Sequence, residues 1–347
     1  DNIPPHKDME EGSPTAMQRL ELCRLNFASL PKTEVSDMEI QRDGKSYSAD
    51  TLERLQEQFP GAEFSLVIGS DMLMSFEEWY RFDWLLENAS LTVISREEDD
   101  RERLEKQREY MEKKYSARIH ILSRSPLPMS SGEIRVWLRR RMGSDTLSRN
   151  VYAEIIRNRY YDASPELTWL REQVMPYLKP KRVAHVAGCE SEAVLLAMHY
   201  GEDPEIAAEA GILHDITKKL SYDEQLNLCE KYGIVCDKTE LGNVKLLHAK
   251  TGAALARDVF GVSQEVYDAI CWHTTGKPDM TRLEKIVYLA DYIEPTRDFP
   301  GVEKLRALAY KDMDEAMALG LKMSLEEIRE KGVEPHKDTV EAYLWYK

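Results

Sequence analysis

The residues with the clearest chemical potential are His214 and Asp215, which follow the apolar run from Ala210 to Leu213. Imidazole and carboxylate groups are seldom left in a packed interior unless another group compensates them. A divalent metal ion can do so, because neutral imidazole nitrogen and carboxylate oxygen are good ligands for iron, manganese and zinc. A single His-Asp pair is weak evidence for a metal site. The prediction therefore depends on whether other potential metal ligands occur in the same part of the chain.

Four further polar residues lie in apolar helical stretches of the same half of the chain: His185, His248, His273 and Asp291. Each alone is more commonly a satisfied core or surface group. An isolated buried aspartate would, however, be costly. Six such residues, spread over five expected helices, favour one shared site, because helical bundles build metal sites from side chains on facing helices.

Helices must position these residues, since strand patterns stop after residue 165 and apolar residues recur with helical periodicity. The expected helices span about 166–177, 180–200, 204–216, 221–232, 243–260, 263–274, 281–294 and 301–331. Two starts are well marked. Asp203 and Pro204 supply a cap and a proline at the first helical position, and Thr281 with Glu284 forms a capping box. We therefore expect an all-α C-terminal domain.

The order and surroundings of these residues resemble the HD-domain phosphohydrolases, in particular the bacterial symmetrical dinucleoside-tetraphosphatases of the YqeK type. The similar stretches are Arg182-Val-Ala-His185, Leu213-His-Asp-Ile-Thr-Lys218, Leu247-His248, His273-Thr-Thr-Gly276 and Ala290-Asp-Tyr-Ile-Glu-Pro-Thr-Arg297. The resemblance covers about residues 166–347. It implies an HD-domain helical bundle that uses iron to split diadenosine tetraphosphate into two ADP molecules.

The resemblance also implies a role for each residue. Four side chains would hold the metal ion: His185, His214, Asp215 and Asp291. Two more would reach a second ion or the substrate phosphates: His248 and His273. The expected substrate-binding residues are Arg182, Lys218, Thr274, Gly276 and Arg297. Asp215 and Lys218 are the expected catalytic residues, and iron is the expected ion, although manganese and zinc suit the same ligands.

These residue types fit hydrolysis of a polyphosphate. A bound divalent ion lowers the pKa of its water from about 15.7 toward about 7 and so supplies hydroxide at neutral pH. Cationic side chains stabilise the charge spread over the transferred phosphoryl group, and no covalent intermediate is needed. Asp215 could be a bridging ligand or a proton acceptor, and the sequence leaves both roles open.

The first half of the chain alternates helical and strand-like patterns. Helical stretches near 14–30, 51–59 and 101–116 alternate with apolar runs at Phe64 to Ile68, Leu91 to Ile94 and Arg118 to Leu122. This alternation predicts an α/β layer with a largely parallel sheet. Ligands of such sheets bind beyond the carboxyl ends of the strands, which places Gly69 and Asp71 at the mouth of a site.

The stretch from Ser130 to Arg135 opens a helix, with Ser130 as the cap and Glu133 as its capping-box partner. A helix start with hydroxyls, free amides and an arginine is a ready anion site, although a plain capped helix explains the stretch as well. Trp79 could stack on a heterocycle, but an aromatic residue at this spacing from Phe76 is more often part of the core.

Four ordered stretches resemble bacterial nicotinate-nucleotide adenylyltransferase over about residues 1–161: Pro4 to Lys7, Ser46 to Leu52, Ile68 to Trp79 and Ser130 to Arg135. The resemblance implies a Rossmann-like α/β nucleotidyltransferase domain that uses Mg²⁺. Three residues would lie beside the pyridine nucleotide: Gly69, Asp71 and Trp79. Three others would face the ATP phosphates: Ser130, Ser131 and Arg135.

One departure weakens the expectation of adenylyl transfer. The family's His-x-Gly-His stretch, which stabilises the transferring phosphates, precedes the Pro-Pro-His-Lys loop in the family and occurs nowhere in this chain. We therefore expect an upstream segment to be missing from the sequence. The domain would lack its first strand and helix, leave a sheet edge unpaired and be inactive in adenylyl transfer.

Length and composition limit the number of domains, the classes of partner and the cellular compartment that we expect. A chain of 347 residues predicts two domains, which we divide at 162/163 because Ser164 and Pro165 break the preceding helix. A net charge of -15 argues against nucleic-acid or membrane-surface partners. Five cysteines without a CxxC pair are typical of reduced thiols in a cytoplasmic protein.

The expected partners are small nucleotides, namely diadenosine tetraphosphate and ADP, with ATP and nicotinate mononucleotide for the first domain. A homodimer is left open. Two alternatives to the tetraphosphatase hypothesis remain. One is a nucleotide-sensing module that binds without turnover, and the other is an HD phosphohydrolase that acts on other nucleotides such as deoxynucleotides.

Overall fold

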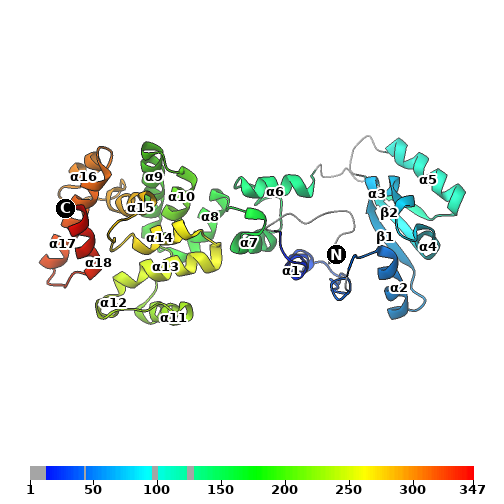
Figure 1. Cartoon of the computed structure of the whole chain (residues 1–347), viewed down its shortest axis with the longest axis horizontal. Helices are drawn as coiled ribbons and strands as arrows, with labels where there is room; N and C mark the ends of the chain where they lie inside the picture. Colours follow the sequence, from blue (N-terminus) through cyan, green and yellow to red (C-terminus); the bar gives the residue numbers. More distant parts are fainter. Residues whose placement is uncertain (1–12, 43, 96–100, 123–128) are drawn as a thin grey trace. The chain divides into compact units, whose positions relative to one another are not determined.

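The computed structural model describes residues 13–42, 44–95, 101–122 and 129–347. The chain forms two compact units, Asp1–Trp137 and Leu138–Lys347 (Figure 1). The stretch from Pro4 to Lys7, which contributed to the adenylyltransferase resemblance, lies outside the described residues. Over the described ranges, we find no helix with both the length and the apolar character needed to cross a membrane.

The first unit is an α/β layer. Its elements are α1 (Ala16–Phe27), α2 (Ser48–Gln58), β1 (Phe64–Gly69), α3 (Ser70–Met74), α4 (Phe82–Asn88), β2 (Ala89–Ile94), α5 (Arg101–Tyr115) and β3 (Ile119–Leu122). α6 (Ser131–Arg139) spans the division between the units. The expected α/β class and the three expected strands are confirmed.

The sheet of the first unit is parallel and has the strand order β1-β2-β3. Its register pairs Phe64 with Ala89 and Leu91 with Ile119. Alternation along β2 buries Ala89, Leu91 and Val93 against Leu85 of α4 and helices α2 and α5. Within the described ranges, β1 pairs with β2 alone, so its other edge has no strand partner.

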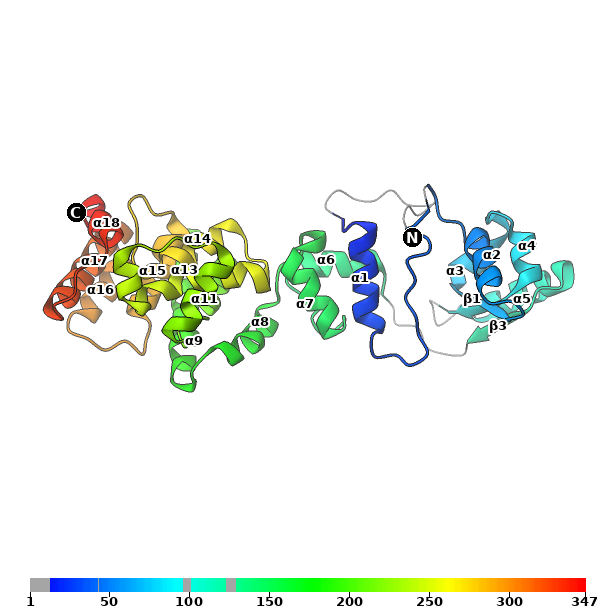
Figure 2. The same ribbon diagram turned by 90° about the horizontal axis from the view of Figure 1, so that it is seen from below.

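The second unit is entirely helical, as expected. Its helices are α7 (Arg149–Asn158), α8 (Leu167–Val174), α9 (Val183–Tyr200), α10 (Pro204–Leu213), α11 (Tyr222–Tyr232), α12 (Lys238–Gly242), α13 (Val244–Phe260), α14 (Gln264–Trp272), α15 (Arg282–Ile293), α16 (Val302–Ala309), α17 (Met313–Glu330) and α18 (Lys337–Tyr346). α9 packs on α10 and α15, while α14 packs on α10, α13 and α15 (Figures 1 and 2). These five helices form the bundle that carries the predicted site.

The bundle helices begin where the sequence predicts. The Asp203 carboxylate accepts from the backbone N–H of Glu205 at 2.8 Å and starts α10. In the capping box of α15, the N–H of Thr281 donates to the Glu284 carboxylate at 2.6 Å. Such caps satisfy N–H groups that the first helical turn leaves unpaired.

Gly211 allows α10 to lie unusually close to α9. A Cβ atom at this position would be 2.8 Å from the Glu190 Cα and 3.2 Å from the Glu190 backbone nitrogen. Only glycine permits this contact between backbones, because real Cβ atoms do not approach so near. The close approach brings the end of α10, where His214 follows, toward the first turn of α9, which carries His185.

Some expected boundaries differ from the observed ones. The single helix expected at 301–331 is divided into α16 and α17, because Asp312 caps a new helix by accepting from the N–H of Glu315 at 2.9 Å. α18 was not expected. The compact units divide at Trp137/Leu138, whereas the sequence suggested 162/163.

Buried ion pairs explain why residues 138–162 join the helical unit. Arg141 and Arg159 both precede the break at Pro165, and both bind the Glu209 carboxylate of α10, at 2.8 Å and 2.6 Å. Glu209 is buried, so these contacts tie the α7 region to the bundle. Compactness and common ancestry are different criteria, and the boundary of the two family segments at 162/163 remains a prediction.

Candidate metal centre

Four buried histidines share one hydrogen-bonding pattern. The Nδ1 atoms of His214, His248 and His273 lie 2.7, 2.5 and 2.6 Å from the carbonyl oxygen three residues earlier. The Nδ1 of His185 lies 2.9 Å from Oε1 of Glu294. A carbonyl or carboxylate oxygen can only accept, so each Nδ1 carries a ring proton, and Nε2 is the ring atom that can offer a lone pair.

These lone pairs face one another in two places. The Nε2 atoms of His185 and His214 are 3.2 Å apart, and those of His248 and His273 are 3.0 Å apart. Burial lowers the pKa of His214 and His248 well below the usual value and that of His273 to about 3. A proton shared between two facing Nε2 atoms is therefore unfavourable. A metal ion can instead accept the lone pairs of both neutral imidazoles.

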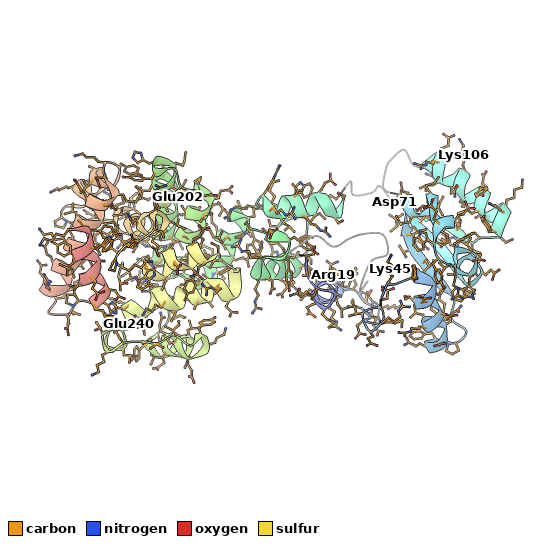
Figure 3. All side chains as sticks on the ribbon, in the orientation of Figure 1. Arg19, Lys45, Asp71, Lys106, Glu202 and Glu240 are labelled. Atoms are coloured by element: carbon orange, nitrogen blue, oxygen red, sulfur yellow. The ribbon has the colours of Figure 1, made fainter. Side chains whose placement is uncertain are left out.

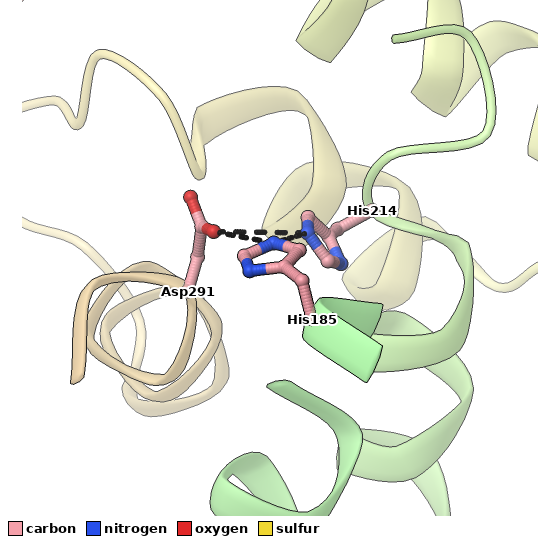
Figure 4. Close-up of side chains that lie close together, drawn as sticks. All are labelled: His185, His214 and Asp291. Atoms are coloured by element: carbon pink, nitrogen blue, oxygen red, sulfur yellow. Dashed lines mark hydrogen bonds and ion pairs between the residues drawn. The ribbon is translucent and has the colours of Figure 1, made fainter. Parts of the chain in front are cut away.

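The first ligand group consists of His185 on α9, His214 after α10 and Asp291 on α15. Its candidate ligand atoms all lie within 4.8 Å of one another. Asp291 Oδ1 is 3.0 Å from His185 Nε2 and 3.8 Å from His214 Nε2. Figure 4 shows the three side chains converging from separate helices.

The second ligand group consists of Asp215, His248 and His273, which also lie within 4.8 Å of one another. Asp215 Oδ1 is 3.3 Å from His248 Nε2 and 3.9 Å from His273 Nε2. The two groups lie side by side in the bundle, since the ring centroids of His214 and His273 are 5.2 Å apart.

Asp215 connects the two groups. Its Oδ2 lies 3.8 Å from His185 Nε2 and 3.6 Å from His214 Nε2, so one oxygen faces each group. The side chain is 1% exposed, and Oδ1 has no hydrogen-bond partner among the described residues. A buried anionic oxygen without a donor is costly, and a cation between the histidines would compensate it. The donor set thus fits two divalent ions with a shared carboxylate.

Three cationic residues surround the ligand carboxylates. Arg182 contacts Asp215 Oδ2, and Arg297 Nη2 donates to Asp291 Oδ1 at 2.6 Å. Lys218 Nζ donates to His248 Nε2 at 2.8 Å and lies 3.7 Å from Asp215 Oδ1. Burial lowers the pKa of Lys218 to about 8.

The charge state of Asp291 reflects these neighbours. Burial raises the pKa of Asp291, but the adjacent His185 imidazole and the charges of the surrounding groups outweigh this and hold it well below the usual value. The carboxylate is therefore ionised and available as a ligand.

The two residues expected as hydroxyl and amide donors differ in their placement. Thr274 Oγ1 lies 3.3 Å from His248 Nε2 and 3.2 Å from His273 Nε2, at the second group. Gly276 is buried, and its N–H donates to the Trp272 carbonyl at 2.9 Å to close the end of α14. Its amide is therefore occupied in helix capping, and the structure does not place it at the site.

Sequence reasoning missed Glu294, which is fully buried and binds His185. It lies one helical turn after Asp291, in the stretch that supports the resemblance. A buried glutamate at that spacing from a predicted ligand was the available signal.

A third group of potential ligands, Asp237, Glu240 and His336, is already satisfied. His336 Nδ1 accepts from the N–H of Asp338 at 3.3 Å, and Nε2 donates to Asp237 at 3.0 Å. Glu240, labelled in Figure 3, binds Lys250 at 2.5 Å. Both ring nitrogens of His336 are occupied by these hydrogen bonds, so this group attaches α18 to α12 instead of forming a metal site.

In the first unit, Gly69 ends β1 and Asp71 lies on α3 directly beyond it, as expected (Figure 3). Trp79 stacks on Phe76 at 4.9 Å between ring centroids and packs against the core, which favours the core interpretation of Trp79.

At the start of α6, the Ser130 N–H donates to Glu133 at 2.7 Å, and Ser130 Oγ accepts from the Glu133 N–H at 3.2 Å. The predicted capping box is confirmed. The proposed phosphate contacts of Ser130, Ser131 and Arg135 remain predictions.

Comparison with known proteins supports both family resemblances. Residues 182–296 match the HD domain family. A symmetrical bis(5'-nucleosyl)-tetraphosphatase of Halalkalibacterium halodurans is 39% identical over 171 residues, covering 49% of this chain and 91% of the relative. A crystal structure of a "predicted HD superfamily hydrolase involved in NAD metabolism" from Clostridium acetobutylicum is 37% identical, with a TM-score of 0.51, and the match covers 53% of this chain and 98% of that chain.

The adenylyltransferase segment and the fusion also have relatives. A probable nicotinate-nucleotide adenylyltransferase of Carboxydothermus hydrogenoformans is 32% identical over 160 residues, which cover 46% of this chain and 79% of the relative. A probable nicotinate-nucleotide adenylyltransferase/Ap4A hydrolase of Mycoplasma pneumoniae is 26% identical over 311 residues, which cover 88% of this chain and 83% of the relative. The chain therefore belongs to the HD-domain symmetrical bis(5'-nucleosyl)-tetraphosphatases, joined to a segment of the nicotinate-nucleotide adenylyltransferase family.

Proposed function

We propose that the second unit hydrolyses diadenosine tetraphosphate to two ADP at a centre of two divalent ions. The observation that carries the proposal is the position of the Asp215 carboxylate. Its Oδ2 faces the Nε2 atoms of His185 and His214, and its Oδ1 faces those of His248 and His273. Each ion would have its own imidazole ligands, and Asp215 would be shared. This arrangement favours the bridging-ligand role of Asp215 over the proton-acceptor role.

The first ion would be held by His185, His214 and Asp291, and the second by His248 and His273, with Asp215 common to both. Bound divalent ions supply a hydroxide nucleophile near neutral pH and polarise phosphoryl oxygens. Iron is the proposed ion, in keeping with the family resemblance, and metal analysis of anaerobically purified protein tests its identity.

We assign the cationic residues of this site to binding of the substrate phosphates. Arg182, Arg297 and Lys218 now lie on the ligand carboxylates or on a ligand histidine. If ions occupied those ligands, the guanidinium and ammonium groups would be free to contact phosphate oxygens. A guanidinium matches a phosphate through two parallel hydrogen bonds, so we assign the polyphosphate chain to Arg182 and Arg297. Thr274 can donate its hydroxyl to the same chain.

Product analysis tests the proposal most directly. The full chain with Mn²⁺ or anaerobic Fe²⁺ should convert diadenosine tetraphosphate to ADP alone, without ATP and AMP. His248→Asn should abolish turnover, whereas His199→Asn, an exposed histidine of the same unit, should not change it. Binding of one substrate per chain without ADP release would support the nucleotide-sensing alternative. Faster hydrolysis of deoxynucleotides at equal concentration would support the other alternative.

For the first unit we propose a nucleotide-binding role, with ATP and nicotinate mononucleotide as its ligands and Mg²⁺ as its ion. Adenylyl transfer requires the family's His-x-Gly-His residues, and this chain does not contain them. Nicotinate adenine dinucleotide should therefore form from these two substrates only where a segment with those residues is present. The nucleotide ligands and the five free cysteines are consistent with a cytoplasmic location, which we include in the proposal.

A further inference from the structure

His185 is oriented differently from the other three histidines of the centre. His214, His248 and His273 each donate Nδ1–H to the carbonyl three residues earlier in their own helical segment. His185 is the third residue of α9 and donates instead to Glu294, which follows the end of α15. It is the one ring of the four that is oriented by a charged acceptor from another helix.

Glu294 is itself fixed in one position. It is fully buried, and its Oε2 accepts from the Thr296 N–H at 2.6 Å. Its Oε1 accepts from Thr296 Oγ1 at 2.5 Å as well as from His185. The acceptor of the His185 proton is therefore a rigid carboxylate.

α9 leaves a space for this carboxylate at Gly188. A Cβ atom at Gly188 would be 2.5 Å from Glu294 Oε2 and 3.3 Å from its Cδ. Gly188 lies one helical turn after His185, so the residue that Glu294 orients and the residue that admits it belong to the same helix. The helix is regular here, and the requirement for glycine is one of space.

We propose that Glu294 is a positioning residue of the metal centre, admitted by Gly188, which holds the His185 ring with its Nε2 lone pair toward Asp291 and makes that ring a stronger ligand. The inference rests on the proposed metal centre. Carboxylates that accept the second N–H of a ligand histidine fix its tautomer and raise its basicity, and their loss typically weakens metal affinity about 10- to 100-fold.

Glu294→Gln in the full chain tests the inference, with Mn²⁺ as the probe and free Mn²⁺ measured by electron paramagnetic resonance. The amide cannot replace both acceptors. If its NH₂ group faces Thr296, two donors oppose each other, and if it faces His185 the Nδ1–H bond is lost. We expect the dissociation constant for Mn²⁺ to rise about 10- to 100-fold. Gly188→Ala should weaken binding in the same direction.

Glu190→Gln is the matched control, because Glu190 is a buried glutamate of α9 that binds Arg171 and no histidine. It should leave Mn²⁺ affinity unchanged. A second readout is the Nδ1–H resonance of His185 in zinc-loaded protein labelled with ¹⁵N-histidine. Glu294→Gln should shift this resonance and leave those of the other three ligand histidines in place.

The possible outcomes separate the inference from the proposed function. If the wild-type chain binds no Mn²⁺, the metal centre fails, and the positioning role with it. If the wild type binds and Glu294→Gln binds equally well, only the positioning role is overturned. A purely structural role would lower the melting temperature of metal-free Glu294→Gln without moving the His185 resonance, and that result would also refute the inference.

Discussion

Gly211→Ala should damage the metal centre from outside it, because Gly211 sets the distance between α9 and α10. The added Cβ would start 2.8 Å from the Glu190 Cα. Ordinary carbon contacts lie at about 3.5–4.0 Å, so the two backbones must separate locally by roughly 0.7 Å or more. His214 follows Gly211 by one turn and depends on its carbonyl, which accepts the Nδ1–H at 2.7 Å.

The expected magnitudes follow from this displacement. Overpacking costs about 1–3 kcal/mol, while alanine gains about 1 kcal/mol over glycine in a helix interior. The net loss in the free energy of unfolding should therefore be about 0–2 kcal/mol. Metal sites tolerate ligand displacements of about 0.2 Å, so the loss in Mn²⁺ affinity should be much larger than the loss in stability.

Calorimetric titration with Mn²⁺ and urea denaturation measure the two quantities on the same protein. Gly242→Ala is the matched control, since a Cβ at Gly242 would meet nothing within 4 Å. It should retain the affinity of the wild type and equal or exceed its stability. Wild-type Mn²⁺ affinity in Gly211→Ala would refute the reasoning that the close approach of these helices builds the centre.

Three further changes have defined outcomes. Asp215→Asn should reduce the Mn²⁺ stoichiometry from two ions per chain to one or none. It should slow hydrolysis at least about 100-fold, since a divalent ion contributes several kcal/mol to catalysis. Retention of two ions would contradict the bridging role. Glu209→Gln should lower the free energy of unfolding by about 3 kcal/mol in urea because two arginines lose their buried partner, whereas exposed Glu205→Gln should cost little. Gly261→Ala should lower the melting temperature more than Gly233→Ala. Both glycines have a positive φ, of 57° and 65°, but an added Cβ would be 2.5 Å from a backbone oxygen of α7 at Gly261 and would meet nothing within 4 Å at Gly233. Equal effects would exclude the clash at Gly261.

The sequence identified most of the elements and most of the site. Caps at Asp203 and Thr281 act locally, within one helical turn, so the starts of α10 and α15 could be predicted correctly. The break before α17 was missed although Asp312 supplies a cap. Its apolar surroundings continue the helical periodicity, so the pattern alone showed no interruption.

Burial and tautomer could not be derived from residue types. The sequence placed Gly276 at the site because its neighbours match a family motif, yet its amide closes α14. It gave no role to Glu294, because the contact with His185 joins positions that are 109 residues apart. It also left open the role of Asp215, since that role depends on which atoms its two oxygens face.

The sequence by itself determined the ligand types, the helical framework that carries them and the absence of the His-x-Gly-His motif from this chain. Only the tertiary structure decided that the imidazoles form two facing pairs, that Asp215 lies between them and that Gly188 and Gly211 leave the space for this arrangement. The physical reason is that helix formation depends on interactions within a turn or two. The direction of a lone pair is fixed instead by hydrogen bonds and backbone contacts between helices that meet only in the folded chain.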